Sequence, residues 1–332
     1  MLENTKTKFH RYFIILVKLR KKNKNVSLLL LLSIVIYTYN YYTKNNIKIC
    51  LCAIAKNEIL YIREFVEHYK KIGYNKIIIY DNNDEKDENI EEAIEDYIQN
   101  GFVKIIKLRV TNPDIIPQFY AYKDCYSRYN KFFDWLSFYD VDEFLEIDKK
   151  YNLIQDFLKD KTFEKCKNIK INWLIYFDKN ILYYENKPVQ ERIRKYNYND
   201  PSNIHIKSTV RGNLSKNYWE KMLTPHSSEL KFTSCSSSGK KIKYDSPYNI
   251  PPDYTNAFLK HYKNKSFEEY CYKLKRGRAD VNKTLSKVKF NNAYKYLLLK
   301  SKGNIEKSKI IYKIFENHII YLNIFIFCHL MK

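Results

Sequence analysis

Short apolar runs alternate with segments of helical periodicity from residue 47 to residue 140. The runs have strand length and are apolar throughout, as is typical of strands buried in a parallel sheet. They cover residues 47–54, 76–80, 102–108 and 135–140. Between the runs, apolar positions recur at helical spacing over residues 57–73, 87–99 and 117–130. Four such units predict an α/β fold with a mostly parallel central sheet and helices on both faces.

The pattern is less regular after residue 140. A further helix is predicted over 151–158, and apolar runs predict strands over 169–177, 189–196 and 205–211. Residues 224–253 are rich in Ser, Pro and Lys, as loops are, and residues 266–280 return to helical spacing. We therefore expect one α/β domain over residues 47–285. Residues 286–332 form a C-terminal extension to which the sequence assigns no role.

An apolar stretch near the amino terminus, residues 26–42, follows a basic segment. Its length is at the short end of the range that spans a bilayer. More Lys and Arg lie before it than directly after it, and tyrosines end it, which predicts a single membrane anchor with a cytoplasmic amino terminus. No small-residue cleavage site is evident, so we expect the anchor to be retained in a membrane-attachment region over residues 1–46. The alternative is a buried amphipathic helix.

Such an anchor determines where the rest of the chain lies. In a eukaryote the α/β domain would face a Golgi-like lumen, and in a bacterium it would face the envelope. If the segment is instead only membrane-associated, the domain would lie at the cytoplasmic membrane face.

The formal net charge of +22 narrows the range of partners. A basic surface attracts phosphates, nucleic acid or anionic membranes. The Lys and Arg residues are spread along the whole chain and interleaved with Asp and Glu, whereas nucleic-acid readers cluster them. We therefore expect no nucleic-acid partner.

Seven cysteines are present without a C-x-x-C pair. An odd count with this spacing indicates neither a zinc ribbon nor a dense disulfide framework. Cys50 and Cys52 share one face of a predicted strand, where they are expected to be small core residues.

Polar side chains follow the first four predicted strands. In open α/β sheets ligands bind at the carboxyl ends of the strands, so these side chains are expected to form one rim. They are Asn57 and Glu58 after the first strand, Asp81 and Asn82 after the second, Gln118 after the third and Asp140-Val141-Asp142 after the fourth. The first two pairs are candidates to bind a base or ribose, although Asn57 is also a candidate helix cap.

The acidic triad is the candidate metal site. Oxygen ligands suit Mg²⁺ or Mn²⁺, which bind few protein carboxylates together with substrate phosphates. Asp142 is expected to be a direct ligand, and Asp140 to reach the metal, the ribose or both. Glu143 points away from them in an extended segment and is expected to be structural. His261 is the preferred third ligand and His226 its rival.

Further groups are expected to bind phosphate or move a proton. Gln118 and Lys123 lie on a helix whose amino terminus faces the rim, a favourable place for phosphate. Arg276 and its basic neighbours are candidates to close over a diphosphate, with a solvated helix face as the alternative. The acceptor proton needs a carboxylate, for which Asp178 and Glu191 are candidates.

Together these segments resemble glycosyltransferase family 92 and its bacterial relatives. The resemblance lies in CLCAIAKNE, YIREFVEHYKKIGYNKIIIYDNND, QFYAYKDC, DWLSFYDVDEFLEI, INWLIYF, ERIRKY, IKSTVR and LKHYKNKSFEEYCYKLKRGRAD, in that order. It implies a GT-A fold, a nucleotide-sugar donor (often a UDP-galactose), a glycan or other hydroxyl acceptor and an inverting reaction. It also implies Asp140 and Asp142 as the metal pair and His261 as the C-terminal histidine. Residues 224–253 depart most from the family.

Two other functions remain open at this point. A basic binding module would bind polyanions in a salt-sensitive way without a metal. A nucleotidyltransferase would also use paired aspartates and Mg²⁺, but with two metals and release of pyrophosphate.

Overall fold

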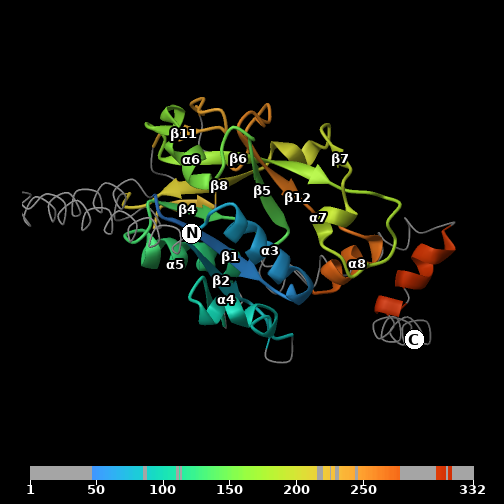
Figure 1. Cartoon of the computed structure of the whole chain (residues 1–332). Coiled ribbons are helices and arrows are strands. Elements are labelled where there is room, and N and C mark those ends of the chain that lie inside the picture. Colours follow the sequence, from blue (N-terminus) through green and yellow to red (C-terminus); the bar gives the residue numbers. More distant parts are fainter. Residues whose placement is uncertain are drawn as a thin grey trace, which may run out of the picture. The chain divides into compact units, whose positions relative to one another are not determined.

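The computed structural model places the α/β domain in a unit that begins at Lys48. It describes residues 47–84, 88–109, 112, 114–214, 220–224, 226–228, 232–243, 246–276, 304–311 and 313–315 (Figure 1). The predicted anchor over residues 26–42 lies outside the described residues. Within them, no helix has the length and apolar character needed to cross a membrane.

Four parallel strands form the first half of the sheet, in the order β3-β2-β1-β4. Figure 1 shows β2, β1 and β4 of this order. They are β1 (Ile49–Ala55), β2 (Lys76–Asp81), β3 (Val103–Lys107) and β4 (Trp135–Phe138). Every residue of β1 and β4 is buried, in agreement with the continuous apolar runs. The sequence therefore predicted this half correctly.

Two long helices cover opposite faces of these strands. Helix α5 (Pro117–Tyr129) packs through Tyr122 and Cys125 against Cys52 and Phe138. Helix α3 (Ile59–Lys71) lies on the other face: its Tyr69 ring meets Tyr74, whose hydroxyl bonds Ser137 at 2.8 Å. Since Ser137 and Phe138 are neighbours in β4, their side chains point to opposite faces.

The second half of the sheet is mixed, so the expectation of a mostly parallel sheet is wrong there. Beyond β4 the order continues β8-β6-β12-β5. Strand β8 (Ile206–Arg211) is antiparallel to both neighbours, β12 (Ala257–His261) is parallel to β6 (Asn168–Tyr176), and β5 (Glu143–Ile147) is antiparallel to β12. Parallel neighbours need long crossover connections, usually helical, and the short helices between β6 and β8 do not supply one.

Residues 189–196, predicted to be a strand, begin with the short helix α7 (Val189–Arg192) and continue to β7 (Tyr196–Asn197). The Glu64 carboxylate of α3 accepts hydrogen bonds from Val189 N at 2.8 Å and Gln190 N at 3.2 Å. The first amides of a helix have no partner within the helix, and here a residue distant in sequence accepts their hydrogen bonds. Local periodicity cannot reveal such a partner.

The remaining elements are short. The helix predicted over 87–99 is a 3₁₀ turn, Glu92–Ile94, followed by α4 (Glu95–Gln99). The others are α6 (Ile154–Lys159), the 3₁₀ turns Lys161–Phe163 and Pro201–Ile204, β9 (Met222–Thr224), β10 (Ser227–Ser228), β11 (Ser234–Cys235) and α8 (Phe267–Arg276).

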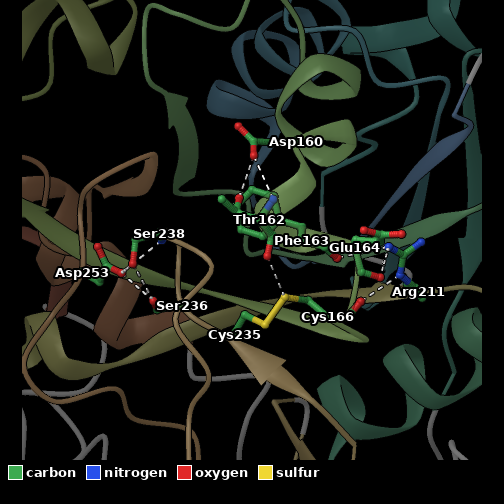
Figure 2. The surroundings of a disulfide bond; sticks show 10 residues. All are labelled: Asp160, Thr162, Phe163, Glu164, Cys166, Arg211, Cys235, Ser236, Ser238 and Asp253. Atoms are coloured by element: carbon green, nitrogen blue, oxygen red, sulfur yellow. Dashed lines mark hydrogen bonds between the residues drawn. A yellow bond between two sulfur atoms is a disulfide. The ribbon is translucent and has the colours of Figure 1, made fainter.

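Two disulfides tie separate elements together. Cys52 of β1 is bonded to Cys125 of α5, so the expectation that Cys52 is only a core residue is wrong. Cys50 is a free, buried thiol as expected. The second bridge joins Cys166 to Cys235, and Arg211 donates to the Cys166 carbonyl at 2.8 Å beside it (Figure 2).

Part of the C-terminal extension packs on the α/β domain. Residues 305–311 and 313–315 are helical. Ile311 and Phe315 are buried together with Cys271 of α8. This segment therefore covers one side of α8, a helix that also contributes to the site described next.

Candidate functional site

Asp140 lies directly after β4 and is surrounded by hydrogen-bond donors. Its Oδ1 accepts from Gln118 Nε2 at 2.8 Å and from the Tyr122 hydroxyl at 3.0 Å. These two residues lie one turn apart on α5, so they present adjacent side chains. The other carboxylate oxygen of Asp140, Oδ2, accepts from Lys207 Nζ at 2.6 Å. Gln118 and Asp140, predicted to share one rim, are therefore in direct contact.

A tight turn holds the triad in place. Glu143 N donates to the Asp140 carbonyl at 3.0 Å, and Glu143 Oε2 accepts from Asp140 N at 2.9 Å. Glu143 is fully buried, and burial raises the pKa of its carboxyl well above the usual value. Its contacts within the turn agree with the structural role expected for it.

Lys207 of β8 is a buried cation that the sequence analysis did not identify. Its ammonium lies 2.6 Å from Asp140 and 3.5 Å from Glu143 Oε1. Burial works against the charged form, but the Asp140 and Glu143 carboxylates outweigh it and raise the pKa of Lys207 above its usual value. The available signal was a lysine within the strand-like run HIKSTVR, which has a half-polar pattern and so did not stand out.

Asp142 faces a different set of partners from Asp140. It is buried, with Oδ1 3.5 Å from His261 Nε2 and Oδ2 bonded to Lys273 Nζ. Tyr262 N donates to the Asp142 carbonyl at 2.9 Å, which brings the end of β12, and hence His261, beside the triad. Burial alone would raise the pKa of Asp142, but Lys273 and His261 hold it well below its usual value.

His261 is held against an aromatic wall. Its ring centroid lies 4.3 Å from that of Trp173 on β6. Burial lowers the pKa of His261, which favours the neutral imidazole, and within the described part of the chain its Nδ1 has no hydrogen-bond partner. For His226, the rival, burial and the Lys207 and Lys170 ammonium groups lower the pKa.

The predicted three-ligand metal set is not assembled. Within the residues that the structure describes, no three His, Cys, Asp or Glu side chains converge as metal ligands. Asp140 is bonded to Lys207, whereas Asp142 and His261 lie side by side. A neutral imidazole and a carboxylate still fit a Mn²⁺ or Mg²⁺ ion whose remaining ligands are phosphate oxygens and water.

A cleft of about 600 Å³ lies beside this pair, between α8 and the amino-terminal end of α3. Four cations line it, Lys265, Lys273, Lys275 and Arg276, together with three carboxylates, Glu88, Glu268 and Glu269. Lys273, which bonds Asp142, is therefore a wall of the cleft as well. The lining thus has one more cation than carboxylates, a small positive balance that favours an anionic ligand.

Arg276 organises the loop after β1. It donates to the Lys56 and Asn57 carbonyls at 2.7 and 2.8 Å and forms an ion pair with the buried Glu58. Asn57 has a φ of 49°, and its buried Oδ1 has no hydrogen-bond partner among the residues that the structure describes. The helix cap is Glu58 rather than Asn57, without a side-chain cap bond, so the capping alternative for Asn57 is wrong.

The residues at the end of β2 form contacts with their neighbours in the domain. Asp81 is buried, with Lys107 Nζ 2.9 Å from its carboxylate and Asn83 N 3.0 Å away. Asn82, half-buried, donates its backbone amide to the Ala55 carbonyl at 2.8 Å. Lys123 lies over the Phe119 ring, 4.4 Å from its centroid.

The two candidate bases lie on separate elements. Asp178 follows β6 and is paired with Lys195 at 2.7 Å. Hydrogen bonds from Lys195 and from the Asn180 amide lower the pKa of Asp178. Glu191 is exposed in the first turn of α7.

A buried carboxylate that the sequence analysis missed lines the same cleft. Glu269 accepts two bonds from Arg192, at 2.8 and 2.7 Å, and one from the Tyr61 hydroxyl at 2.7 Å. Burial alone would raise the pKa of Glu269, but the hydrogen bonds from Arg192, Ser266 and Tyr61 lower it to about 2. The signal was present in Ser266-Phe-Glu-Glu269, a capping box in which each end bonds the other's backbone amide.

An α/β sheet with a carboxylate, an imidazole and a cationic cleft near its strand ends is suited to bind a phosphorylated ligand. The profile of glycosyltransferase family 92 matches residues 45–297. The chain belongs to glycosyltransferase family 92, which confirms the resemblance seen in its sequence.

Plant members of the family are among the similar proteins. A family 92 protein of Ricinus communis is 31% identical over 115 residues, which cover 35% of this chain and 20% of that protein. One of Oryza sativa subsp. japonica is 29% identical over 111 residues, 33% of this chain and 18% of that protein. The chain thus aligns with about a fifth of the length of these relatives.

Solved structures are more distant. S. aureus TarS 1–349 in complex with UDP has a TM-score of 0.33 at 14% identity, over 52% of this chain and 48% of that chain. The same protein in complex with UDP-GlcNAc has a TM-score of 0.32 at 12% identity, over 82% and 80%. TM-scores this low support no conclusion about this chain.

Proposed function

We propose that this protein transfers a sugar from a nucleotide-sugar, a UDP-sugar above all, to a hydroxyl of a glycan or glycoconjugate. One observation carries the proposal. Asp142 and His261 lie side by side, and Lys273 links them directly to the cationic cleft. A carboxylate and an imidazole suit a divalent cation, and the cations of the cleft suit a diphosphate.

Each group has a part in the proposed GT-A-type reaction. Asp142 and His261 would hold Mn²⁺ or Mg²⁺, and such an ion would supply positive charge to neutralise a departing nucleoside diphosphate. Lys273 and Arg276 attract the same charge from the side of the cleft. Asp140, which stays bonded to Gln118 and Lys207, presents its exposed edge to the ribose.

The reaction is proposed to be inverting. The acceptor oxygen bonds to the anomeric carbon while the bond from that carbon to the diphosphate breaks, and a carboxylate takes the acceptor proton. A lowered pKa makes Asp178 a weak base. Glu191 is therefore the better of the two candidates.

Two disulfide pairs support an oxidising compartment for the α/β domain. This agrees with the proposal of an amino-terminal anchor that leaves the domain in a lumen or outside the cell, and it counts against the cytoplasmic membrane face.

Calorimetry of the full-length protein with UDP-, GDP- and dTDP-sugars, each with and without Mn²⁺, tests the proposal. We expect Mn²⁺-dependent binding of one class, lost in Asp142→Ala, and release of a nucleoside diphosphate on turnover. Binding of none of these sugars would overturn the transferase proposal. Release of pyrophosphate would indicate a nucleotidyltransferase, and salt-sensitive polyanion binding without a metal would indicate a basic binding module.

A further inference from the structure

Lys273 joins two parts of the site that are otherwise separate. Its ammonium bonds the Asp142 carboxylate, and it also donates to the Lys263 carbonyl at 3.1 Å. Along α8 it belongs to the cationic wall of the cleft, with Lys275 and Arg276. One positive charge therefore lies directly against the carboxylate expected to hold the metal.

We propose that Lys273 is a latch: it neutralises Asp142 until a nucleoside diphosphate arrives, then moves to the diphosphate and leaves Asp142 free to bind a divalent cation. This inference rests on the proposed function, because it assumes the same metal and donor. It adds an order of events, in which the metal binds weakly alone and tightly with the nucleotide. Such coupling is reciprocal, so the metal also strengthens nucleotide binding.

Electrostatics supports the exchange. A divalent cation bound at Asp142 would lie next to the Lys273 ammonium and be repelled by it, unless Lys273 moves away. Lys265 and Arg276 add further positive charge near Asp142, while Glu58 partly offsets them. A diphosphate in the cleft supplies negative charge. The Lys273 ammonium can then lie against the diphosphate while the divalent cation lies against Asp142.

Burial distinguishes this lysine from the other one at the triad. The Lys273 side chain is 29% exposed at the edge of the cleft, whereas Lys207 is 3% exposed. Lys207 also bridges two carboxylates within the sheet. Lys273 therefore has solvent and a cleft to move into, and Lys207 is a fixed part of the fold.

Mn²⁺ binding to the full-length protein, followed by electron paramagnetic resonance with and without UDP, tests the latch. We expect Lys273→Met to bind Mn²⁺ at least about fivefold more tightly than the wild type when UDP is absent, and to show less coupling between Mn²⁺ and UDP. Lys275→Met is the matched control: it removes a cleft cation on the same helix that does not contact Asp142, so its Mn²⁺ affinity without UDP should equal that of the wild type. Lys273→Gln keeps a hydrogen bond to Asp142 without the charge and repeats the test if the Met variant does not fold.

Two outcomes separate the latch from the proposed function. If the wild type binds Mn²⁺ and UDP together but the Lys273 variants bind Mn²⁺ alone no more tightly than Lys275→Met, the latch is wrong and the transferase proposal stands. If the wild type binds Mn²⁺ neither alone nor with UDP, and binds no other nucleotide-sugar with Mn²⁺, the proposed function fails and the latch fails with it.

Discussion

Asp140 and Asp142 are two residues apart, yet the fold places them in different electrostatic surroundings. Asp140 meets a fixed, buried cation and two neutral donors from α5. Asp142 meets the His261 imidazole and the ammonium of Lys273, whose side chain is 29% exposed. A carboxylate with several fixed donors is held in one orientation, whereas one with an imidazole and a movable partner is free to accept a metal. This supports the separate roles proposed for them.

The buried Lys207 is expected to matter for stability. Lys207→Met leaves the Glu143 carboxyl and Asp140 Oδ2 without the ammonium that they contact. Removing one partner of a buried ion pair is strongly destabilising. We expect a loss of roughly 2–4 kcal/mol in the free energy of unfolding, at the low end of such effects because the Asp140 side chain is 29% exposed. Urea titration followed by circular dichroism measures it.

Lys260→Met is the control for that variant. It breaks the more exposed pair with Glu146 on the neighbouring strands and should cost at most about 1 kcal/mol. Equal losses in the two variants would contradict the importance assigned to the buried cation.

Glu269 is expected to make the free energy of unfolding depend on pH in the acidic range. Its pKa falls from 4.5 to about 2 in the folded protein, so folding favours the charged carboxylate. This contribution is complete above about pH 4.5 and is lost as the pH falls towards 2; the shift corresponds to about 3 kcal/mol. Urea titrations at pH 7 and pH 3 should therefore show a smaller loss on acidification for Glu269→Gln than for the wild type.

Glu67→Gln provides the comparison, because Glu67 forms an exposed i,i+4 pair with Arg63. Its loss on acidification should match that of the wild type. If Glu269→Gln and Glu67→Gln lose the same stability between pH 7 and pH 3, the buried network around Glu269 does not have the strength inferred for it.

At the scale of elements, prediction from sequence succeeded where a pattern is local. The buried strands β1 and β4 read as continuous apolar runs, and α5 begins at Pro117, a good first helical residue. Prediction failed where a partner distant in sequence determines the local structure. Residues 189–192 are helical with Glu64 at their free amides, and the β5–β12 pairing joins segments more than a hundred residues apart.

The Cys52–Cys125 bridge is expected to stabilise the contact between β1 and α5. It closes a loop with a sequence separation of 73, for which a stabilisation of about 2–4 kcal/mol is typical. Cys52→Ala/Cys125→Ala should lose that much in urea titration. Because α5 also carries Gln118 and Tyr122, which bond Asp140, the double variant should bind the donor more weakly as well.

Cys50→Ala is the matched control, since Cys50 is a buried free thiol on the same strand and loses only one atom. It should cost about 1 kcal/mol and leave donor binding unchanged. A double variant that is no less stable than Cys50→Ala would show that the two cysteines are not bridged in the native protein.

At the scale of the whole molecule, the site is assembled from segments far apart in the chain. The bonds from Lys207 to Asp140 and from Lys273 to Asp142 span 67 and 131 residues. Strand ends and residue type could nominate Asp140 and Asp142 from sequence, whereas His261 was nominated by its residue type and by the basic residues that follow it. The lysine that meets each aspartate depends on how β8 and α8 are placed, which no local pattern encodes.

Because the metal and nucleotide would bridge segments that long, their binding should stabilise the whole domain. A ligand present at 100 times its dissociation constant adds about 2.7 kcal/mol to the stability of the native state. For a protein of this size that raises Tm by roughly 4 °C. We expect this shift in thermal unfolding with Mn²⁺ and UDP together, a much smaller one with either alone, and its reversal by EDTA.

Variants test whether the shift arises at the proposed site. Asp142→Ala and His261→Ala should each abolish it, since each removes one of the two protein ligands. Glu146→Gln, on the half-buried end of β5, should retain it in full, because Glu146 pairs with Lys260 away from the cleft. A shift that survives in Asp142→Ala and His261→Ala would place the metal elsewhere on the molecule. Asp142 would then have a structural role and would not be a metal ligand.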